Sequence, residues 1–327
     1  MKKLLFFLLP TLLILTSCTD VKTTETVPSQ NGTLTLNLSN LPALDDTQVL
    51  AAWIIDDAGK VVHKFGKLSL SGNSFTGSFP LTLNAYQQNT NNQFVCISIE
   101  DRDAPLNDTT TSNLFLLVSK IRTNSSQLTV VPKNPVGVTF GSDFDDQKYL
   151  GADTSSAVPP SFITAKGLYT VFTPTGANAN TNSGIWLLNY KSAGVYETGL
   201  RLPELPTGWT YKGWVKVNGK YLSVGEFKVA SGNDAQNPSV GANPMPKFPG
   251  EDFLQNDTLG VAYPIDLAGQ EVMISVEPTG FAKKKPFPLY LLKGVIPTSV
   301  TNTTSYILEN NFKNFPSGSA VYEISIY

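Results

Sequence analysis

Residues 214–220 read Trp214-Val215-Lys216-Val217-Asn218-Gly219-Lys220, a strand-like run that ends in an Asn-Gly pair. Asn and Gly tolerate the positive φ angles of a tight hairpin, so the pattern predicts two antiparallel strands joined at residues 218 and 219. An earlier stretch, Trp53-Ile54-Ile55-Asp56-Asp57-Ala58-Gly59-Lys60, has the same order of tryptophan, apolar run and turn residues. Both stretches predict a hairpin whose first strand carries a tryptophan.

The two hairpins belong to an internal repeat. The step from Trp53 to Trp214 is 161 positions, and the step from Pro42 to Pro203, each in a Leu-Pro-x-Leu sequence, is again 161. Three further pairs of segments match downstream: 65–68 with 224–227, 95–100 with 272–277, and 114–117 with 288–292. A repeat of this length indicates two copies of one β-module.

The other apolar runs are short and alternate with polar residues between clusters of Gly, Asn, Asp, Ser and Pro, which is typical of antiparallel strands and turns. The clearest runs are 33–38, 69–79, 94–100 and 114–118. The chain has 22 prolines and 25 glycines, which oppose long helices. We predict an all-β fold of two related antiparallel β-sandwich domains of the immunoglobulin-like kind, at residues 32–132 and 133–327.

The first 17 residues have the pattern of a signal peptide: two lysines, an apolar run and a small-residue cleavage site. The apolar run is far shorter than the roughly 20 residues that a membrane-spanning helix needs. The Leu-Thr-Ser-Cys ending resembles the lipobox of bacterial lipoproteins, so we predict that Cys18 carries the lipid and that residues 18–31 form a polar tether. We expect a lipid-anchored protein of the cell envelope. Thr19, where an Asp would retain a lipoprotein in the inner membrane, favours the outer membrane, with its periplasmic face or the cell surface both open.

The charge pattern and the cysteine content argue against a nucleic-acid partner and against an intramolecular disulfide. The chain has 24 basic and 26 acidic residues without charged blocks, so we expect no nucleic-acid partner. Cys18 and Cys96 are the two cysteines, so a lipidated Cys18 leaves no intramolecular disulfide. Cys96 lies in an alternating strand-like run, where we interpret it as a small buried apolar side chain.

A larger set of residues in the second half forms a family-like pattern: 202–215, 218–220, Ser223, Gly225, Phe227, 248–254, 272–278 and 310–318. On these residues, the segment from about Phe162 to Tyr327 resembles the extracytoplasmic domain of anti-sigma-K-factor-like proteins. The resemblance implies a β-domain that lies outside the cytoplasm. In that family a cytoplasmic segment captures the sigma factor and a transmembrane helix joins it to the outer domain. We expect neither part in a chain that is lipidated at Cys18, and hence no direct contact with a sigma factor.

We predict that the protein is not an enzyme and has no cofactor. The single histidine, His63, lies in the predicted return strand of the first hairpin, and neither G-x-S-x-G nor H-E-x-x-H occurs. A glycosidase-like pair of Glu100 and Glu277 requires carboxyl groups about 5 to 10 Å apart, and the two residues belong to separate modules. The sequence therefore indicates no catalytic residue.

Two acidic segments offer the hard oxygen ligands that suit Ca²⁺. They are Asp143 with Asp145 and Asp146, and the segment Gly250-Glu251-Asp252. Neither matches the calcium-loop pattern, so we interpret them as solvated loop residues and predict no metal. A calcium site at Asp143, Asp145 and Asp146 is the alternative.

The aromatic residues suggest where a partner binds. Trp53 and Trp214 recur in both copies, which favours a place in the core. Trp186 and Trp209 do not recur, so these two, with Tyr211, are the candidate partner surface.

Two further segments deserve notice as loops. The segment 231–249 has no counterpart in the first copy, and long loops in compact β-domains are often functional. The run Lys283-Lys284-Lys285 predicts a solvated hairpin tip, with contact to anionic lipid or glycan as the alternative.

Taken together, these patterns predict a non-enzymatic, lipid-anchored envelope module that binds an envelope protein or a glycan. The alternative is an extracytoplasmic sensor that works with a separate anti-sigma factor system. The membrane is a partner through the lipid on Cys18.

Overall fold

The computed structural model describes residues 30–56, 58–83, 93–107, 109–112, 114–121, 127–130, 162–178, 181–205, 207–234, 238–255 and 260–324. The predicted signal peptide, Cys18 and nearly all of the predicted tether lie outside these residues. So do Asp143, Asp145 and Asp146. The predictions for these segments stay predictions.

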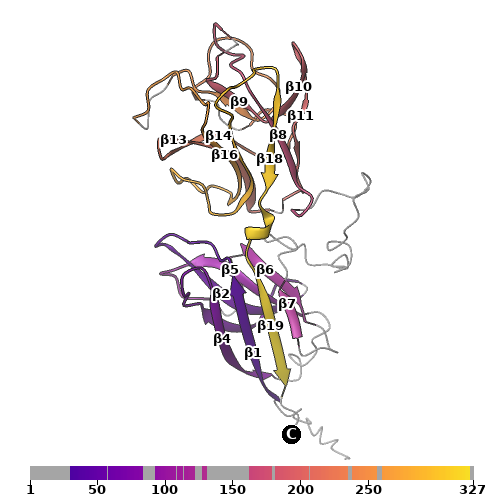
Figure 1. Ribbon diagram of the computed structural model, residues 1–327. Helices are drawn as coiled ribbons and strands as arrows, with labels where there is room; N and C mark the ends of the chain where they lie inside the picture. Colours follow the sequence, from indigo (N-terminus) through magenta and orange to yellow (C-terminus); the bar gives the residue numbers. More distant parts are fainter. Residues whose placement is uncertain are drawn as a thin grey trace, which may run out of the picture.

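The described chain is all-β, as the sequence predicts, and forms two lobes (Figure 1). The first lobe contains β1 (Gln30–Ser39), β2 (Gln48–Asp56), β3 (Val61–Lys67), β4 (Phe75–Leu83), β5 (Gln93–Asp101), β6 (Phe115–Lys120) and β7 (Gln127–Val130). The second contains β8 (Lys166–Val171), β9 (Gly184–Trp186), β10 (Leu188–Ser192), β11 (Val195–Thr198), β12 (Leu200–Arg201), β13 (Trp209–Val217), β14 (Lys220–Phe227), β15 (Gly250–Asp252), β16 (Glu271–Pro278), β17 (Tyr290–Val295) and β18 (Ser305–Asn310). The 3-10 turn η2 (Phe312–Asn314) and β19 (Ser317–Ile324) complete the chain. Within the described residues, no helix has the length and hydropathy to cross a membrane.

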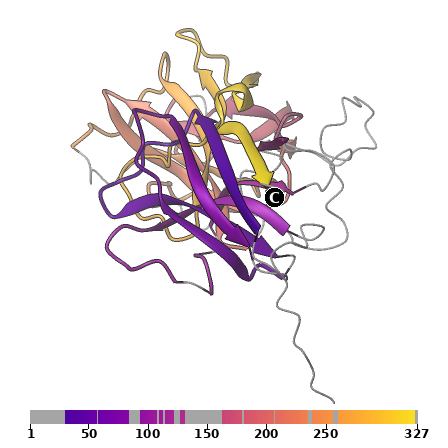
Figure 2. The same cartoon turned by 90° about the horizontal axis from the view of Figure 1, so that it is seen from below.

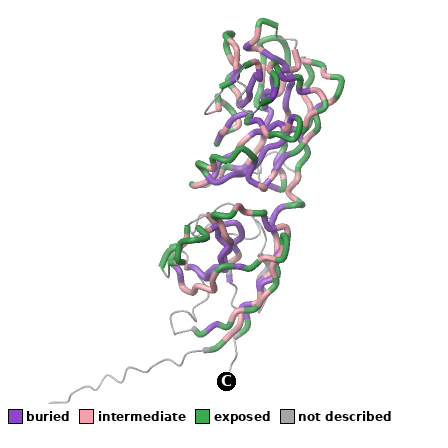
Figure 3. The backbone as a smooth tube through the Cα atoms, turned by 90° about the vertical axis from the view of Figure 1, so that its left-hand side faces the viewer, coloured by how far each residue is buried: buried purple, intermediate pink, exposed green. Residues whose placement is uncertain are grey.

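The first lobe is a sandwich of two four-stranded antiparallel sheets, in the orders β4-β1-β19-β7 and β3-β2-β5-β6. Alternation along β1 directs Leu34, Leu36 and Leu38 into one core cluster, where they meet Leu50 and Ile54 of β2. The buried segments fill the interior of both lobes (Figure 3). The immunoglobulin-like part of the fold prediction stays a prediction.

The second lobe is built on a nine-stranded sheet in the order β14-β13-β16-β17-β18-β8-β9-β15, with β12 beside β8. The hairpin β10-β11 forms a separate two-stranded sheet. Because side chains alternate along β13, Val215 and Val217 point into the core, and Lys212, Trp214 and Lys216 lie on the opposite, outward face.

The last strand crosses back to the first lobe. β19 pairs with β1 along residues 317–324 and with β7 along residues 318–321, so it lies inside the first sheet. Figures 1 and 2 show the yellow strand beside the indigo β1. The sequence division at residue 133 places this strand in the second domain, and the structure corrects that for 317–324. Its alternating residues are compatible with a sheet of either lobe. In the structure it pairs with β1 and β7, which have no other strand between them.

The predicted repeat is confirmed by the strand register. Trp53 on β2 faces Cys96 on β5, and Trp214 on β13 faces Met273 on β16. A β-bulge immediately precedes each tryptophan in its hairpin, and a second bulge precedes Ser98 and Ser275 in the next strand pair. The turn at Asn218 and Gly219 has the predicted positive φ angles, 50° and 76°. Two equivalent four-stranded units, β3-β2-β5-β6 and β14-β13-β16-β17, therefore carry the two tryptophans.

Two equivalent glycines at the hairpin bulges allow a matched test of this repeat. Gly66 and Gly225 have φ angles of 121° and 123°, which a side chain disfavours by about 1 to 3 kcal/mol. A Cβ atom on Gly66 meets nothing within 4 Å, whereas one on Gly225 would lie 2.0 Å from Asp234 Oδ2. That oxygen also accepts the N–H of Gly250 at 2.9 Å.

We expect Gly225→Ala to lower the free energy of unfolding by more than Gly66→Ala does, because the clash and the loss of the Asp234 contact add to the backbone strain. Urea unfolding of the two variants measures the difference. Equal losses would show that Asp234 moves aside without cost.

Candidate functional site

Trp53 in the first lobe is fixed by hydrogen bonds along the outer face of its sheet. Its indole N–H donates to Ser98 Oγ at 2.8 Å, and the Ser98 hydroxyl donates to Glu100. Glu100 also accepts the backbone N–H of Ser112, in the segment before β6, at 3.1 Å. Trp53 is completely buried, as the sequence predicts.

Trp214 in the second lobe is fixed in the same way. Its indole N–H donates to Glu277 Oε1 at 2.8 Å and to Ser275 Oγ at 3.1 Å. The Ser275 hydroxyl and the backbone N–H of Phe287 donate to the same carboxylate oxygen at 2.5 and 3.2 Å. Burial raises the pKa of Glu277, and these hydrogen bonds act against that rise. Both copies thus hold a tryptophan on a buried serine and a glutamate, which is buried in the second copy and partly buried in the first.

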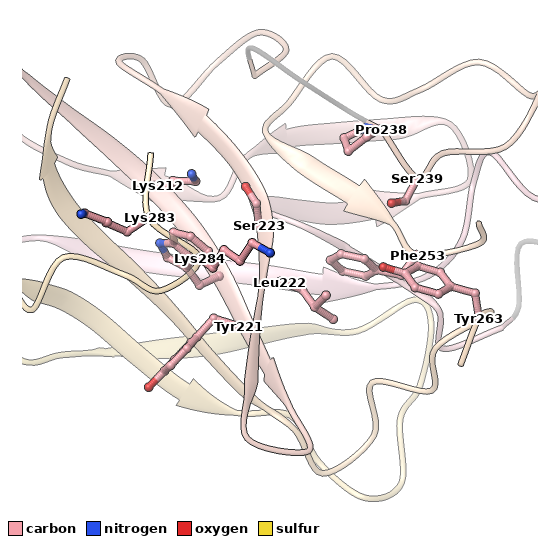
Figure 4. A pocket seen from close by; sticks show the side chains of 11 residues that line it. Lys212, Tyr221, Leu222, Ser223, Pro238, Ser239, Phe253, Tyr263, Lys283 and Lys284 are labelled. Carbon is pink, nitrogen blue, oxygen red and sulfur yellow. The ribbon is translucent and has the colours of Figure 1, made fainter. Parts of the chain in front are cut away.

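A hollow of about 240 Å³ lies beside β13 and β14 and has Trp214 in its lining (Figure 4). We call it the lysine pocket. Its lining includes three lysines and four aromatic residues: Lys212, Lys283, Lys284, Trp214, Tyr221, Phe253 and Tyr263. The lining residues, all within the described chain, include no Asp or Glu.

Two of the lysines are positioned by contacts, one within β13 and one between the two lobes. Lys212 Nζ lies 4.5 Å from the centre of the Trp214 ring, a distance at which an ammonium is attracted to the ring face. Lys283 Nζ lies 3.2 Å from the carboxylate of Asp45, in the first lobe. Asp45 has a lowered pKa, chiefly because Thr47 donates hydrogen bonds to it. The pocket therefore presents positive charge in a defined geometry.

The equivalent place in the first lobe is covered. Leu106 packs against the buried cluster around Trp53, and Lys64 Nζ donates to the Leu106 carbonyl at 3.2 Å. Lys64 stands directly across the hairpin from Trp53, where the second copy has the exposed Ser223 across from Trp214. One scaffold thus occurs twice, with its tryptophan covered by a loop in one copy and overlain by a pocket in the other.

The segment 231–249 contributes to the pocket through Pro238 and Ser239. The backbone N–H of Ser239 donates at 3.2 Å to Glu251 Oε1 on β15. Burial raises the pKa of Glu251 to about 8, so the neutral acid predominates at pH 7. The pocket wall is therefore tied to a buried and largely uncharged carboxyl group.

Asp252, the next residue, joins three segments behind the pocket. Its carboxylate accepts the Trp186 indole N–H at 2.8 Å, the Thr175 backbone N–H at 2.8 Å and the Thr175 hydroxyl at 2.5 Å. Asp252 is completely buried, and burial raises its pKa. The segment Gly250-Glu251-Asp252 is thus buried structure, which corrects its interpretation as solvated loop.

The predicted partner surface is wrong. Trp186, Trp209 and Tyr211 are buried, with exposed fractions of 1%, 0% and 1%. Trp186 bonds to Asp252, Trp209 packs edge-on against Phe287 at 6.1 Å, and the Tyr211 hydroxyl donates to the Pro203 carbonyl at 2.7 Å. Their absence from the repeat reflects different core packing in the second lobe, where Trp186 and Tyr211 have buried hydrogen-bond partners and Trp209 packs on Phe287.

The residues that line the lysine pocket are not among the site residues predicted from the sequence. Lys212 and Tyr221 flank the hairpin turn, and alternation about the buried Val215 already places Lys212 beside Trp214 on the outward face. Lys283 and Lys284 were interpreted as a hairpin tip, which is correct for their exposure. The loop between β16 and β17 places these two lysines in the same pocket as Trp214.

None of the other candidate residues lines the pocket. His63 lies on β3 and packs against Phe65 at 4.7 Å, and partial burial lowers its pKa. Cys96 is completely buried, as predicted, and burial raises its pKa. Glu100 and Glu277 lie in different sheets, each beside the tryptophan of its own copy. Among the described residues, no group of three or more His, Cys, Asp or Glu side chains is arranged to hold a metal ion.

Comparisons with protein-family models, with curated protein sequences and with solved structures find no match for this chain. The resemblance to the outer domain of anti-sigma-K-factor-like proteins stays a prediction. A fold by itself does not define an activity, so the function is inferred from the geometry of the pocket.

Proposed function

We propose that this protein is a lipid-anchored cell-envelope protein that binds an anionic ligand in the lysine pocket and catalyses no reaction. The observation that carries the proposal is the lining of the pocket, in which the described residues include three lysines and no carboxylate. A lipid on Cys18 and a polar tether at 18–31 would hold this pocket at a membrane surface. The chain then acts as an anchored receptor.

Charge and size both support an anionic, ring-sized ligand. Ammonium groups that line a concave, low-dielectric site concentrate anions there. Asp45 balances part of the charge of Lys283, while Lys212 rests on the face of Trp214. The volume of about 240 Å³ is below the range of about 300 to 1,000 Å³ that accommodates drug-sized ligands. The pocket therefore suits one charged ring.

The buried glutamate supports binding without catalysis. Oε1 of Glu277 accepts hydrogen bonds from the Trp214 indole, the Ser275 hydroxyl and the Phe287 backbone. Glu277 is 1% exposed, so it is placed to hold the floor of the pocket and not to exchange protons with a ligand. In the first lobe, Glu100 accepts the hydroxyl of Ser98, which accepts the indole N–H of the covered Trp53.

The lipidated full-length protein in detergent is expected to bind inositol hexakisphosphate, a ring-sized polyanion, and not the neutral myo-inositol. Replacing Lys212 and Lys284 together by Ala should weaken this binding at least about tenfold, because a hydrogen bond to a charged group contributes about 1.5 to 3 kcal/mol. Lys166→Ala, at an exposed position on β8, is the matched control. Isothermal titration calorimetry gives the dissociation constants, and equal affinities for the double variant and wild type would contradict the proposal.

A further inference from the structure

A row of side chains on the outward face of the sheet leads away from the lysine pocket, and within it Trp214 and Met273 are only 2% and 3% exposed. Cross-strand pairing places Ser223 beside Trp214, Trp214 beside Met273, and Met273 beside Lys293. Neighbouring strands lie about 4.8 Å apart, so the row from β14 to β17 is about 14 Å long. This is the length of a short oligosaccharide and exceeds one sugar ring.

The row ends in a second hollow of about 480 Å³, which we call the distal hollow. Its lining includes Glu271, Met273, Lys293, Val295, Ile307 and Glu309. Glu271 pairs with Lys216 at 2.9 Å, and Lys293 faces Glu309 across β17 and β18. Charge is therefore balanced here, in contrast to the lysine pocket. Val295 and Ile307 are 66% and 71% exposed and give the hollow an apolar surface.

Tyrosine rings lie beside the row. Tyr221 lines the lysine pocket and packs edge-on against Trp214 at 6.4 Å. Tyr290 lies on β17, where Lys293 Nζ is 4.6 Å from its ring centre. Burial raises the pKa of Tyr290 to about 12. Two interactions with Tyr221, charge repulsion and a side-chain hydrogen bond, add to this rise. Two half-buried phenols in contact thus form a rigid ledge between the two hollows.

Resting on the proposed function, we infer that the ligand is a short oligosaccharide that carries an acidic sugar at one end. The acidic sugar occupies the lysine pocket, and about two neutral sugars follow the row over the half-buried rings of Tyr221 and Tyr290 to the distal hollow. The apolar C–H face of a sugar ring packs on the tyrosine ledge and on Val295. Sugar hydroxyls donate to the carboxylates of Glu271 and Glu309 and accept from Lys293.

The same groups disfavour two other ligands. A polysaccharide charged on every unit would bring carboxylates against Glu271 and Glu309, where like charges repel. An anionic membrane surface offers headgroup charge to the exposed Lys284 but nothing for the hydrogen-bonding groups of the distal hollow. Charge is thus needed at one end of the ligand and hydroxyl groups at the other.

Titration calorimetry on the lipidated full-length protein tests the inference with matched sugars. The acid-ended trisaccharides are sialyllactose and glucuronosyl-xylobiose, and their neutral counterparts are lactose and xylotriose. Trigalacturonate is charged throughout, and vesicles of phosphatidylglycerol with phosphatidylcholine represent a membrane. We expect at least one acid-ended trisaccharide to bind about tenfold or more tightly than its neutral counterpart and than trigalacturonate.

Two variants separate the hollows. Lys284→Ala should weaken binding of both the acid-ended trisaccharide and its free acidic sugar, whereas Lys293→Ala should weaken only the trisaccharide, each by about tenfold. Lys313→Ala, exposed on η2, is the control. The inference is overturned if inositol hexakisphosphate binds while both acid-ended trisaccharides fail, and competition by trigalacturonate or by the vesicles would then identify the ligand class that replaces it. Absence of binding by inositol hexakisphosphate itself would instead overturn the proposed function.

Discussion

A chain that ends at Pro316 is expected to lose the folded first lobe, although the deleted residues follow the second lobe in the sequence. β19 lies between β1 and β7, and its removal leaves both strands without their shared partner. Ala320 and Tyr322 also leave the core, where they are 0% and 7% exposed. A lobe with a total stability of about 5 to 15 kcal/mol does not survive the loss of an internal strand. Hydrogen exchange should show lost protection throughout residues 30–121.

A chain that ends at Ile324 is the control, because it retains β19 whole. Ala320→Asp provides a single-residue version of the same test, since it places an unpaired carboxylate at a completely buried position. We expect both Ala320→Asp and the truncated chain to become sensitive to protease in the first lobe. Unchanged protection of β1 in the truncated chain would contradict the arrangement of the first sheet.

Asp252→Ala is expected to destabilise the second lobe by about 3 to 5 kcal/mol, because removing one member of a buried polar network leaves its partners unsatisfied. The Trp186 indole N–H and the Thr175 N–H and O–H all donate to this carboxylate. The buried position gives water no access to replace the lost acceptor. Denaturant unfolding followed by tryptophan fluorescence measures the change.

Asp252→Asn keeps the shape and one acceptor oxygen, so a smaller loss is expected. Glu197→Ala is the matched control, because Glu197 pairs with Lys191 at 3.1 Å but its side chain is 60% exposed. Surface ion pairs contribute about 0 to 1 kcal/mol. If Asp252→Ala and Glu197→Ala cost the same, the carboxylate of Asp252 does not hold the three segments together.

The two equivalent tryptophans are both buried but differ in what lies over them. Trp53 and Trp214 have the same register, the same bulges and the same serine and glutamate beneath them. The first copy keeps this unit as structure under Leu106. The second combines it with lysines from β13 and from the loop before β17, and this difference between the copies places the proposed ligand in the second lobe.

The local structure could be predicted from the sequence because its causes are local. Asn218 and Gly219 form the hairpin turn, since these residues adopt positive φ at little cost. Alternation directs Leu34, Leu36 and Leu38 to one side of their strand, as predicted. The recurrence of Trp53 and Trp214 indicated two copies of one unit and a buried place for both rings.

What the tertiary structure alone decided depends on contacts between distant segments. The alternating pattern of residues 317–324 predicts a strand but not the strands that it pairs with, because backbone hydrogen-bonding groups are alike at every sheet edge. Only the tertiary structure shows that it pairs with β1 and β7. The sequence pattern makes Trp186 a candidate for partner binding, whereas in the structure its indole N–H donates to Asp252, 66 residues further along the chain. The lysine pocket likewise joins β13, the segment 231–249 and the loop at 283–284. The loop comes near because β16 pairs with β13, and the segment is held through the bond from Ser239 to Glu251 on β15.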